Sequence, residues 1–339
     1  MGGRYVHRSY VLKRIYFQAW KDNILGGLHL IRMLNFDEIT AIGPITVDIA
    51  ATSACNYQCY FCKAHSYLRS NNISSVFMDG GILDRLVQDL RKLGVKQLLF
   101  AGNGEPLLSK ELPRVILKQG NHFDINVLTN GSLLNVVSPQ LFDNLKHLRI
   151  SLDSGSGIHH QVIHGYQGKN RFSDIIGQIE RLLTYPKARK KIVLYYVITT
   201  DNHNEVDQFL DLAKRYGVQH RIRPVSVDFH ELEGKALSRE AKKENKLYPC
   251  YWGFMQPFIN SSGDVLLCSE GQKTPLGNIK DESFIAIWQR KENVALRFEA
   301  ARMHKSKKPL FKGCYDCANA QGQSLAFRRI YSKLWGLRK

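Results

Sequence analysis

Seven cysteines in two groups are the residues of this sequence whose type and spacing are best suited to chemistry. The groups are Cys55, Cys59 and Cys62, which form a Cys-x3-Cys-x2-Cys motif, and Cys250, Cys268, Cys314 and Cys317. Thiolates are soft ligands, and the three of the first group are close enough in sequence to wrap one face of a [4Fe-4S] cluster. Such a cluster keeps one iron atom without a protein ligand, which leaves a position for an exogenous molecule.

Zinc is the main alternative for both groups. His65 would supply a fourth ligand to the first group, and four cysteines suffice for a structural zinc site in the second. The odd number and short spacings argue for metal ligands over disulfides, and so for a reducing compartment. No run of eighteen apolar residues and no secretory signal pattern occurs, so the sequence predicts a cytoplasmic protein.

The elements that must position these cysteines alternate along the chain between residues 45 and 227. Periodicity predicts strands at 45–52, 96–101, 124–129, 147–152, 191–199 and 219–227, and helices at 81–93, 109–120, 138–145, 171–185 and 203–216. This alternation is typical of an α/β fold built from parallel βα units. Periodicity alone leaves a doubly wound sheet and an incomplete barrel equally open.

Three further motifs follow the second, third and fourth predicted strands: Gly-Asn-Gly-Glu-Pro at 102–106, Thr-Asn-Gly at 129–131 and Ser-Leu-Asp at 151–153. Together with the first cysteine motif, they resemble the radical S-adenosylmethionine (SAM) superfamily. The resemblance implies an incomplete (β/α)6 TIM-like barrel with its site at the carboxyl ends of the strands. It also implies that SAM binds the open iron of the [4Fe-4S] cluster and yields a 5′-deoxyadenosyl radical.

The same resemblance assigns SAM contacts to residues of these motifs. Glu105 is expected to meet the amino group of SAM, with Gly102, Asn103 and Gly104 allowing close approach of the backbone. Phe61 is expected beside the adenine and Ser151 near the ribose or carboxylate. Related enzymes often carry an arginine about a dozen residues after that serine, where this sequence has His164.

The second cysteine group resembles the twitch or SPASM extension of many radical SAM enzymes. Gly263 precedes Cys268 in a Gly-x4-Cys pattern, residues 258–267 are typical of a hairpin, and L276-G-N-I and F284-I-A-I-W288 follow. The four cysteines would fully ligate one auxiliary [4Fe-4S] cluster. The predicted organisation is a basic amphipathic extension at 1–44, a radical SAM barrel at 45–230, and an auxiliary-cluster domain with a basic C-terminal helix at 231–339.

A fully ligated auxiliary cluster cannot bind substrate through an open iron, but it can accept an electron. The expected activity is therefore that of a radical SAM oxidoreductase. The layout resembles that of a radical SAM dehydrogenase that oxidises a cyclitol alcohol, which implies an alcohol of a sugar or cyclitol as the substrate. Arg223, Asp228 and His230 follow the sixth strand, and Arg223 is named as the catalytic base. A peptide-modifying maturase and a sugar epimerase are the alternatives. Residues 1–44 are short for a leader-binding domain, and no cysteine is left to return a hydrogen atom.

The net charge of +18 is concentrated at the C-terminal end, where residues 301–339 carry ten Lys or Arg and one acid. The expected partners are a small-molecule substrate, either anionic or a lipid-linked sugar, and a flavodoxin- or ferredoxin-type reductant. The basic amphipathic ends suit either peripheral membrane contact or capping of the barrel. A zinc-stabilised nucleic-acid binder is a third hypothesis, but the basic stretches lack a recognised motif, so no nucleic acid is expected.

Overall fold

The computed structural model describes the barrel, much of the C-terminal module and all seven cysteines. The described residues are 42–62, 64, 74–166, 171–224, 247, 250–271, 274–311, 314 and 317. The N-terminal extension up to residue 41, the charged stretch 231–246 and the basic segment 318–339 lie outside them. So do His65, Asp228 and His230. The predicted domain boundary near residue 230 also lies outside the described residues.

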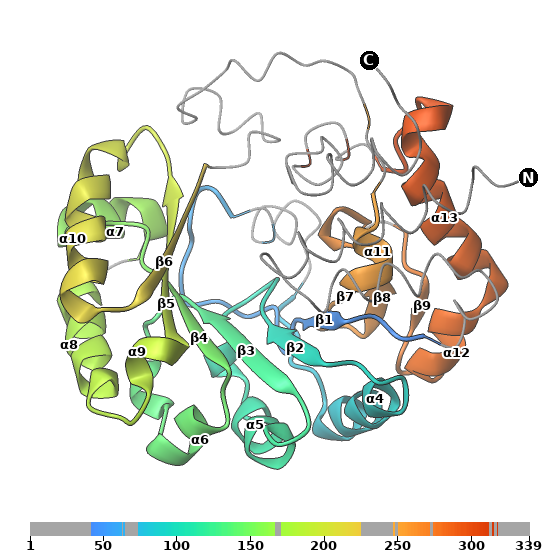
Figure 1. Ribbon diagram of the computed structural model, residues 1–339, viewed down its shortest axis with the longest axis horizontal. Coiled ribbons are helices and arrows are strands. Elements are labelled where there is room, and N and C mark those ends of the chain that lie inside the picture. The colour runs from blue at the N-terminus through green and yellow to red at the C-terminus, as the bar shows by residue number, and fades with distance from the viewer. Residues whose placement is uncertain are drawn as a thin grey trace, which may run out of the picture.

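Six parallel strands form the barrel, in sequence order across the sheet from β1 to β6 (Figure 1). They are β1 (Thr46–Ile49), β2 (Gln97–Phe100), β3 (Asp124–Thr129), β4 (His147–Ser151), β5 (Ile192–Ile198) and β6 (Gln219–Pro224). The edge strand β6 does not pair with β1. The barrel is therefore incomplete, as the sequence predicted, and all six strands lie within the predicted ranges.

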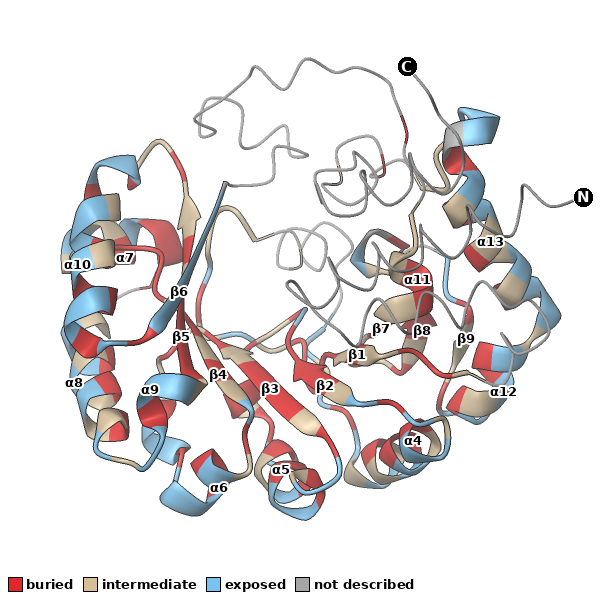
Figure 2. Ribbon diagram, viewed as in Figure 1, coloured by how far each residue is buried: buried red, intermediate tan, exposed pale blue. Residues whose placement is uncertain are grey.

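Helices cover the outer side of this curved sheet (Figure 1). They are α4 (Gly80–Lys92), α5 (Leu112–Gln119), α6 (Pro139–Asp143), α7 (Gly157–His164), α8 (Arg171–Leu183), α9 (Ala188–Lys191) and α10 (Val206–Tyr216), with short 3-10 turns η1 (Pro106–Leu108), η2 (Leu134–Val136) and η3 (His203–Glu205). Figure 2 shows each helix buried toward the sheet and exposed on its far side. The five predicted helices are present. The short helices α7 and α9 were not predicted.

Alternate strand residues point outward into the core beneath the helices. Val47, Leu98 and Val127 are fully buried there, and the register pairs Val47 with Leu98. Side chains of opposite parity face the inside of the barrel, because successive residues of a strand point to opposite faces of its sheet. Asp48 is one of these inward residues.

The C-terminal module continues the barrel sheet. Its elements are α11 (Trp252–Met255), β7 (Phe258–Ile259), β8 (Asp264–Leu266), η5 (Ser269–Gly271), β9 (Gly277–Asn278), α12 (Phe284–Gln289) and α13 (Lys291–Ser306). Strand β7 pairs in parallel with β1, and β8 and β9 extend the sheet to nine strands. The predicted hairpin is confirmed by the antiparallel pairing of β7 and β8. Helix α13 was not predicted.

Two hydrogen bonds reinforce this junction. Gln256 Nε2 donates to Asp48 Oδ1 at 2.7 Å, and Trp288 Nε1 donates to the Ile42 carbonyl at 2.9 Å. Burial raises the pKa of Asp48 to about 7, because few surroundings compensate its charge. Arg297 of α13 lies under Trp288, with 3.9 Å between the guanidinium carbon and the ring centroid.

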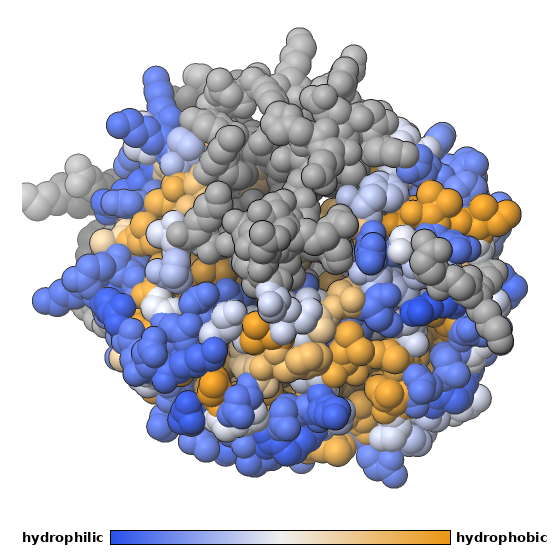
Figure 3. Space-filling model, turned by 180° about the vertical axis from the view of Figure 1, so that it is seen from behind, coloured by the Kyte–Doolittle hydropathy of each residue, from blue (hydrophilic) through white to orange (hydrophobic). Residues whose placement is uncertain are grey.

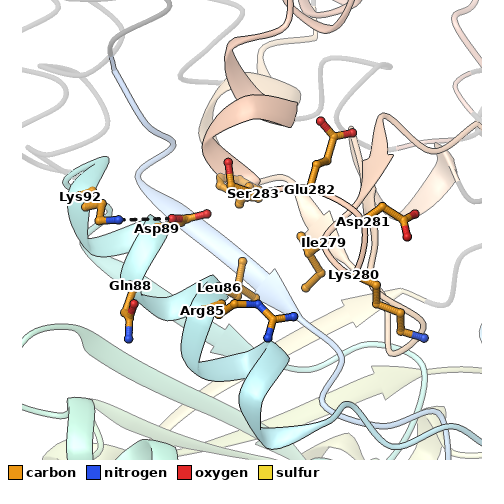
Figure 4. A pocket seen from close by; sticks show the side chains of 11 residues that line it. Arg85, Leu86, Gln88, Asp89, Lys92, Ile279, Lys280, Asp281, Glu282 and Ser283 are labelled. Carbon is orange, nitrogen blue, oxygen red and sulfur yellow. Dashed lines mark ion pairs between the residues drawn. The ribbon is translucent and has the colours of Figure 1, made fainter.

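A groove of about 400 Å³ also lies at the junction, between α4 and residues 279–284 (Figure 4). Charged side chains such as Arg85, Asp89 and Glu282 line it, and no cysteine does. Seen from behind, the described surface has hydrophilic side chains around its periphery and hydrophobic patches between them (Figure 3). Within the described residues no helix has the length and apolar character needed to cross a membrane.

Candidate metal centres

The first cysteine motif lies in the loop that leaves the carboxyl end of β1. The base of this loop is fixed by a pair of hydrogen bonds: Ser53 N donates to the Val76 carbonyl at 2.9 Å, and Val76 N donates to Ser53 Oγ at 2.8 Å. None of Cys55, Cys59 and Cys62 forms a disulfide. The loop therefore presents three soft sulfur ligands from an anchored start.

The thiols of this motif lie close enough to influence one another's ionisation. Burial raises the pKa of Cys59 well above its ordinary value, and the nearby Cys62, Asp153 and Cys55 raise it further. Three thiolates at this position are therefore unfavourable unless a cation compensates them. Iron supplies that compensation, since metal binding deprotonates coordinating thiols. The donor set fits a [4Fe-4S] cluster.

His164, at the end of α7, contacts the cysteine loop directly. Its Nδ1 lies 3.0 Å from Cys59 Sγ, and its ring centroid lies 5.1 Å from that of Tyr57. The side chain is 1% exposed, and burial lowers its pKa to about 4. The resemblance suggested a SAM contact for His164, and the structure places its ring against Cys59 of the first cysteine motif. Gln58 N also donates to the His164 carbonyl at 2.9 Å, so α7 supports the loop through its backbone too.

The Gly-Asn-Gly-Glu-Pro loop after β2 packs on the backbone of the cysteine loop. Glu105 N donates to the Ala54 carbonyl at 2.8 Å. A Cβ on Gly104 would lie 2.3 Å from that same carbonyl oxygen, and one on Gly102, whose φ is +116°, would lie 2.6 Å from the Phe258 ring. Both glycines thus allow close approach between segments of the chain itself. Asn103 is buried beside them.

Glu105 is a buried acceptor that joins this loop to the end of β3. Its Oε1 accepts from Leu107 N at 3.0 Å and from Thr129 Oγ1 at 2.7 Å, and its Oε2 accepts from Asn130 N at 2.7 Å. Burial raises its pKa. Because a carboxylate has about four acceptor positions, one on Oε2 is left for a donor such as the amino group of SAM.

Asn130 was not predicted as a site residue, although its motif was recognised. Its Nδ2 donates to Asn56 Oδ1 at 2.9 Å and lies 4.0 Å from Cys55 Sγ. Its Oδ1 accepts from Ser132 N at 2.9 Å. The side chain therefore connects β3 to the first cysteine, and its position directly after a strand was the available signal.

Ser151 and Asp153 end β4 on the same side of the barrel. Ser151 is half-buried and faces Tyr195 of β5 in the register. Asp153 has a φ of +51°, is fully buried and accepts from Val197 N at 2.6 Å. Burial raises its pKa to about 7. Its Oδ2 lies 3.7 Å from His164 Nε2, which links the β4 loop to α7.

The structure places the remaining two predicted residues at different ends of the site. Phe61 lies within the cysteine loop, and its ring centroid is 6.4 Å from that of His164. Arg223 lies at the carboxyl end of β6, is exposed, and has its guanidinium carbon 5.8 Å from the Tyr195 ring centroid. Because a guanidinium keeps its proton in proteins, Arg223 is better suited to binding negative charge than to accepting a proton.

The second cysteine group lies in the C-terminal module. Cys250 precedes α11 and Cys268 follows β8, while Cys314 and Cys317 follow α13. Burial raises the pKa of Cys250 to about 12, and the neighbouring Cys317 and Cys314 contribute to the increase. Apolar side chains, including Leu310, pack around these three thiols. None of the four cysteines forms a disulfide, so this donor set also fits an iron-sulfur cluster.

Neither group has the geometry of ligands to a single ion. Within the described part of the chain, no three His, Cys, Asp or Glu side chains have such a spacing. The thiolates that hold a [4Fe-4S] cluster each bind a different iron atom, so they lie farther apart than the ligands of one ion.

Comparison with protein families agrees with this reading of the two centres. The radical SAM superfamily matches residues 49–213, and the SPASM iron-sulfur cluster-binding domain matches residues 250–318. The chain therefore contains a radical SAM domain followed by a SPASM domain. Its radical SAM domain implies a [4Fe-4S] cluster and SAM, and its SPASM domain implies additional iron-sulfur ligation.

Curated relatives of this radical SAM protein include two cyclases. It is 31% identical over 180 residues to GTP 3′,8-cyclase of Tolumonas auensis, covering 51% of each chain. It is 29% identical over 169 residues to a probable GTP 3′,8-cyclase of Archaeoglobus fulgidus, covering 50% of this chain and 54% of that protein. The chain thus spans about half the length of the curated relatives it matches.

Solved structures show the same fold at low identity. SuiB of Streptococcus suis bound to its precursor peptide SuiA has a TM-score of 0.58 at 14% identity, covering 81% of this chain and 71% of SuiB. The open conformation of BtrN has a TM-score of 0.50 at 16% identity, covering 83% of this chain and 97% of BtrN. At such identities the similarity extends to the fold alone.

Proposed function

We propose that this radical SAM enzyme is an oxidoreductase that oxidises an alcohol carbon of a sugar or cyclitol and transfers one electron to its auxiliary cluster. The observation that carries the proposal is the presence of four cysteines in the SPASM module, none of which forms a disulfide. Four thiolates saturate a [4Fe-4S] cluster, which leaves it no position for substrate and makes electron acceptance its available role.

When bound, the barrel cluster and SAM supply a 5′-deoxyadenosyl radical, and the auxiliary cluster supplies an electron acceptor. With these groups bound, loss of a hydrogen atom from the alcohol carbon would leave a substrate radical and one molecule of 5′-deoxyadenosine. The substrate radical then loses its hydroxyl proton and one electron, and the carbon-oxygen double bond of a ketone forms. The electron that the reductant provides to cleave SAM is thus balanced by the electron that leaves the substrate.

The residues of the chain have separate roles in this reaction. In this proposal Glu105 offers its remaining acceptor position to the amino group of SAM, Ser151 contacts the ribose or carboxylate, and Phe61 contacts the adenine. The pairing of β7 with β1 joins the auxiliary module to the strand that carries the barrel cysteines. One continuous sheet therefore supports both cluster-bearing loops.

A panel of phosphorylated and unphosphorylated sugars and cyclitols tests the proposal, with anaerobic protein, SAM and a reductant. We expect a product two mass units lighter than its substrate, one 5′-deoxyadenosine per product, and about eight irons per chain. The double variant Cys314→Ala, Cys317→Ala should keep about four irons and SAM cleavage but lose the ketone. Ketone formation by that variant would contradict the electron-acceptor role, and a product of unchanged mass would indicate epimerisation.

A second candidate is cyclisation of a purine nucleoside triphosphate. It is favoured by the similarity to proteins named GTP 3′,8-cyclase, which extends over about half of each chain. Including GTP in the panel separates the two candidates. A cyclase would convert GTP into a cyclised product and would form no two-electron oxidation product. Peptides belong in the same panel to test the maturase alternative.

A further inference from the structure

The inner face of β4, β5 and β6 carries a positive charge that the cluster and SAM motifs do not use. The two faces of these strands are identified by their contacts. Tyr196 and His220 face outward, since their rings lie 4.8 Å and 6.3 Å from that of Phe209 in α10. Side chains of the opposite parity therefore face inward: Arg149 and Ser151 from β4, Tyr195 and Val197 from β5, and Arg221 and Arg223 from β6.

The strand register brings these inward residues side by side. Ser151 pairs with Tyr195, Tyr195 pairs with Arg221, and Val197 pairs with Arg223. The Arg223 guanidinium carbon lies 5.8 Å from the Tyr195 ring centroid, which is a cation-π distance. An aromatic side chain thus supports one of two neighbouring arginines on the edge strand.

The arginines of this face are not paired with carboxylates among the described residues. In the part of the chain that the structure describes, Arg149, Arg221 and Arg223 have no carboxylate at ion-pair distance. Arg149 donates to Asn126 Oδ1 at 3.3 Å, and Arg221 donates to the His220 carbonyl at 3.1 Å. Both acceptors are neutral, so the formal charges persist.

The surrounding ionisable groups agree with a positive field. Burial lowers the pKa of His147, the other inward residue of β4, and the charges of Arg149, Lys146 and Arg221 lower it further. Asp48 faces this space from β1, and burial raises its pKa to about 7, so it is about half ionised at neutral pH and offsets only part of the charge of the three arginines. Asp124 at the start of β3 pairs with Lys146 at 3.4 Å.

The position of this face is that of a substrate site. The cysteine, glycine-rich and Thr-Asn-Gly motifs occupy the ends of β1, β2 and β3, leaving the β5 and β6 side of the opening for the molecule to be oxidised. Both Arg221 and Arg223 are exposed there. Arginine forks bind phosphate through paired, charge-assisted hydrogen bonds, and two forks on alternate residues of one strand suit a phosphate ester.

We propose that Arg221 and Arg223, with Tyr195 holding the second guanidinium, bind the phosphate group of the substrate. The inference rests on the proposed function and narrows its substrate to a phosphorylated sugar, cyclitol or nucleotide. Arg223 is then a binding residue and not the catalytic base.

The test uses full-length protein with both clusters and inorganic pyrophosphate as the probe, measured by calorimetry without reductant. The variant Arg221→Gln, Arg223→Gln removes both charges and should weaken pyrophosphate binding at least about tenfold, since one charge-assisted hydrogen bond is worth about 1.5–3 kcal/mol. The matched control is Arg215→Gln, an exposed arginine of α10 that lies 5.9 Å from a tyrosine ring on the outer side of the barrel. It should bind as the unsubstituted protein does.

Iron content and uncoupled SAM cleavage should be the same in all three proteins, which separates loss of the site from loss of the fold. Equal binding by the double variant, or no binding by the unsubstituted protein, would overturn the proposal. Malonate serves as a second probe, and binding as tight as that of pyrophosphate would overturn the assignment to phosphate in favour of carboxylate. Because the binding measurement involves no turnover of a substrate, its outcome does not depend on whether the enzyme forms a ketone.

Discussion

The contact between His164 and Cys59 should set the reduction potential of the barrel cluster. An iron-bound thiolate sulfur accepts hydrogen bonds, so the prediction requires the proton on His164 Nδ1, 3.0 Å from Cys59 Sγ, and not on Nε2, which lies 3.4 Å from the Leu152 carbonyl oxygen. A hydrogen bond to a cluster sulfur favours the more electron-rich, reduced state and so raises the potential. Changing His164 to Phe keeps an aromatic ring against Tyr57 but removes the donor.

The magnitude follows from the strength of one hydrogen bond. A net value of about 1 kcal/mol, at about 59 mV per 1.4 kcal/mol for a one-electron couple, gives a potential lower by roughly 40 mV in His164→Phe. In His164→Asn an amide N–H lies near the position of Nδ1, so most of the potential should be retained.

An EPR-monitored titration under anaerobic conditions measures this shift. The titration is best made in the Cys314→Ala, Cys317→Ala background, where only the barrel cluster contributes a signal. Iron content of about four per chain in each variant shows that the cluster is intact. A potential unchanged in His164→Phe, or a higher one, would refute the hydrogen-bond reasoning. An equal fall in both variants would point to altered packing instead.

Three other substitutions test separate parts of the structure. Asp48→Asn should raise the free energy of unfolding, and the gain should grow as pH rises from 4 to 7, to at most about 4 kcal/mol. The reason is that the pKa of Asp48 is raised from 3.8 to about 7 in the folded state, where the charged form is penalised. Urea unfolding at pH 4 and pH 8 measures this gain, and a gain that did not depend on pH would contradict the prediction. Glu105→Gln places an amide N–H opposite Asn130 N and should cost about 1–3 kcal/mol of stability. It should also weaken SAM binding in equilibrium dialysis. Unchanged binding would argue against a contact between Glu105 and SAM. Gly104→Ala puts a Cβ 2.3 Å from a carbonyl oxygen of the cysteine loop and should lower the iron content to that of the auxiliary cluster alone. The control is Gly177→Ala in α8, where no atom lies within 4 Å of the added carbon. This variant should keep both clusters.

Local patterns were sufficient for the strands and the long helices, because each strand is a short β-rich run and each long helix has one apolar face. The choice of an incomplete barrel over a doubly wound sheet needed the resemblance to a known family. The glycine-rich turn, with Glu105 at its end, also lies in a contiguous stretch that sequence can recognise. Helix α7 escaped prediction because its apolar residues do not form one buried face. Ile158 and Val162 are 77% and 57% exposed, while His160 and His164 are buried.

The contacts around the site could not be read from sequence because they join distant segments. His164 touches a cysteine 105 positions earlier, and only the packing of α7 on the cysteine loop brings the two together. The pairing of β1 with β7 likewise connects residues about 210 positions apart. In both cases the sequence around one residue contains nothing that indicates which distant residue it contacts.

That pairing also affects how the chain is made. Strand β1 is flanked by β2 and β7 in the finished sheet, so it is an edge strand until residues 258–259 have left the ribosome. An edge exposes unpaired backbone N–H and C=O groups that pair readily with other chains, and contacts so distant in sequence form slowly. The nascent barrel would thus present the strand that leads into its cysteine motif as an aggregation-prone edge, and cluster insertion before the C-terminal module docks would take place on an unfinished sheet.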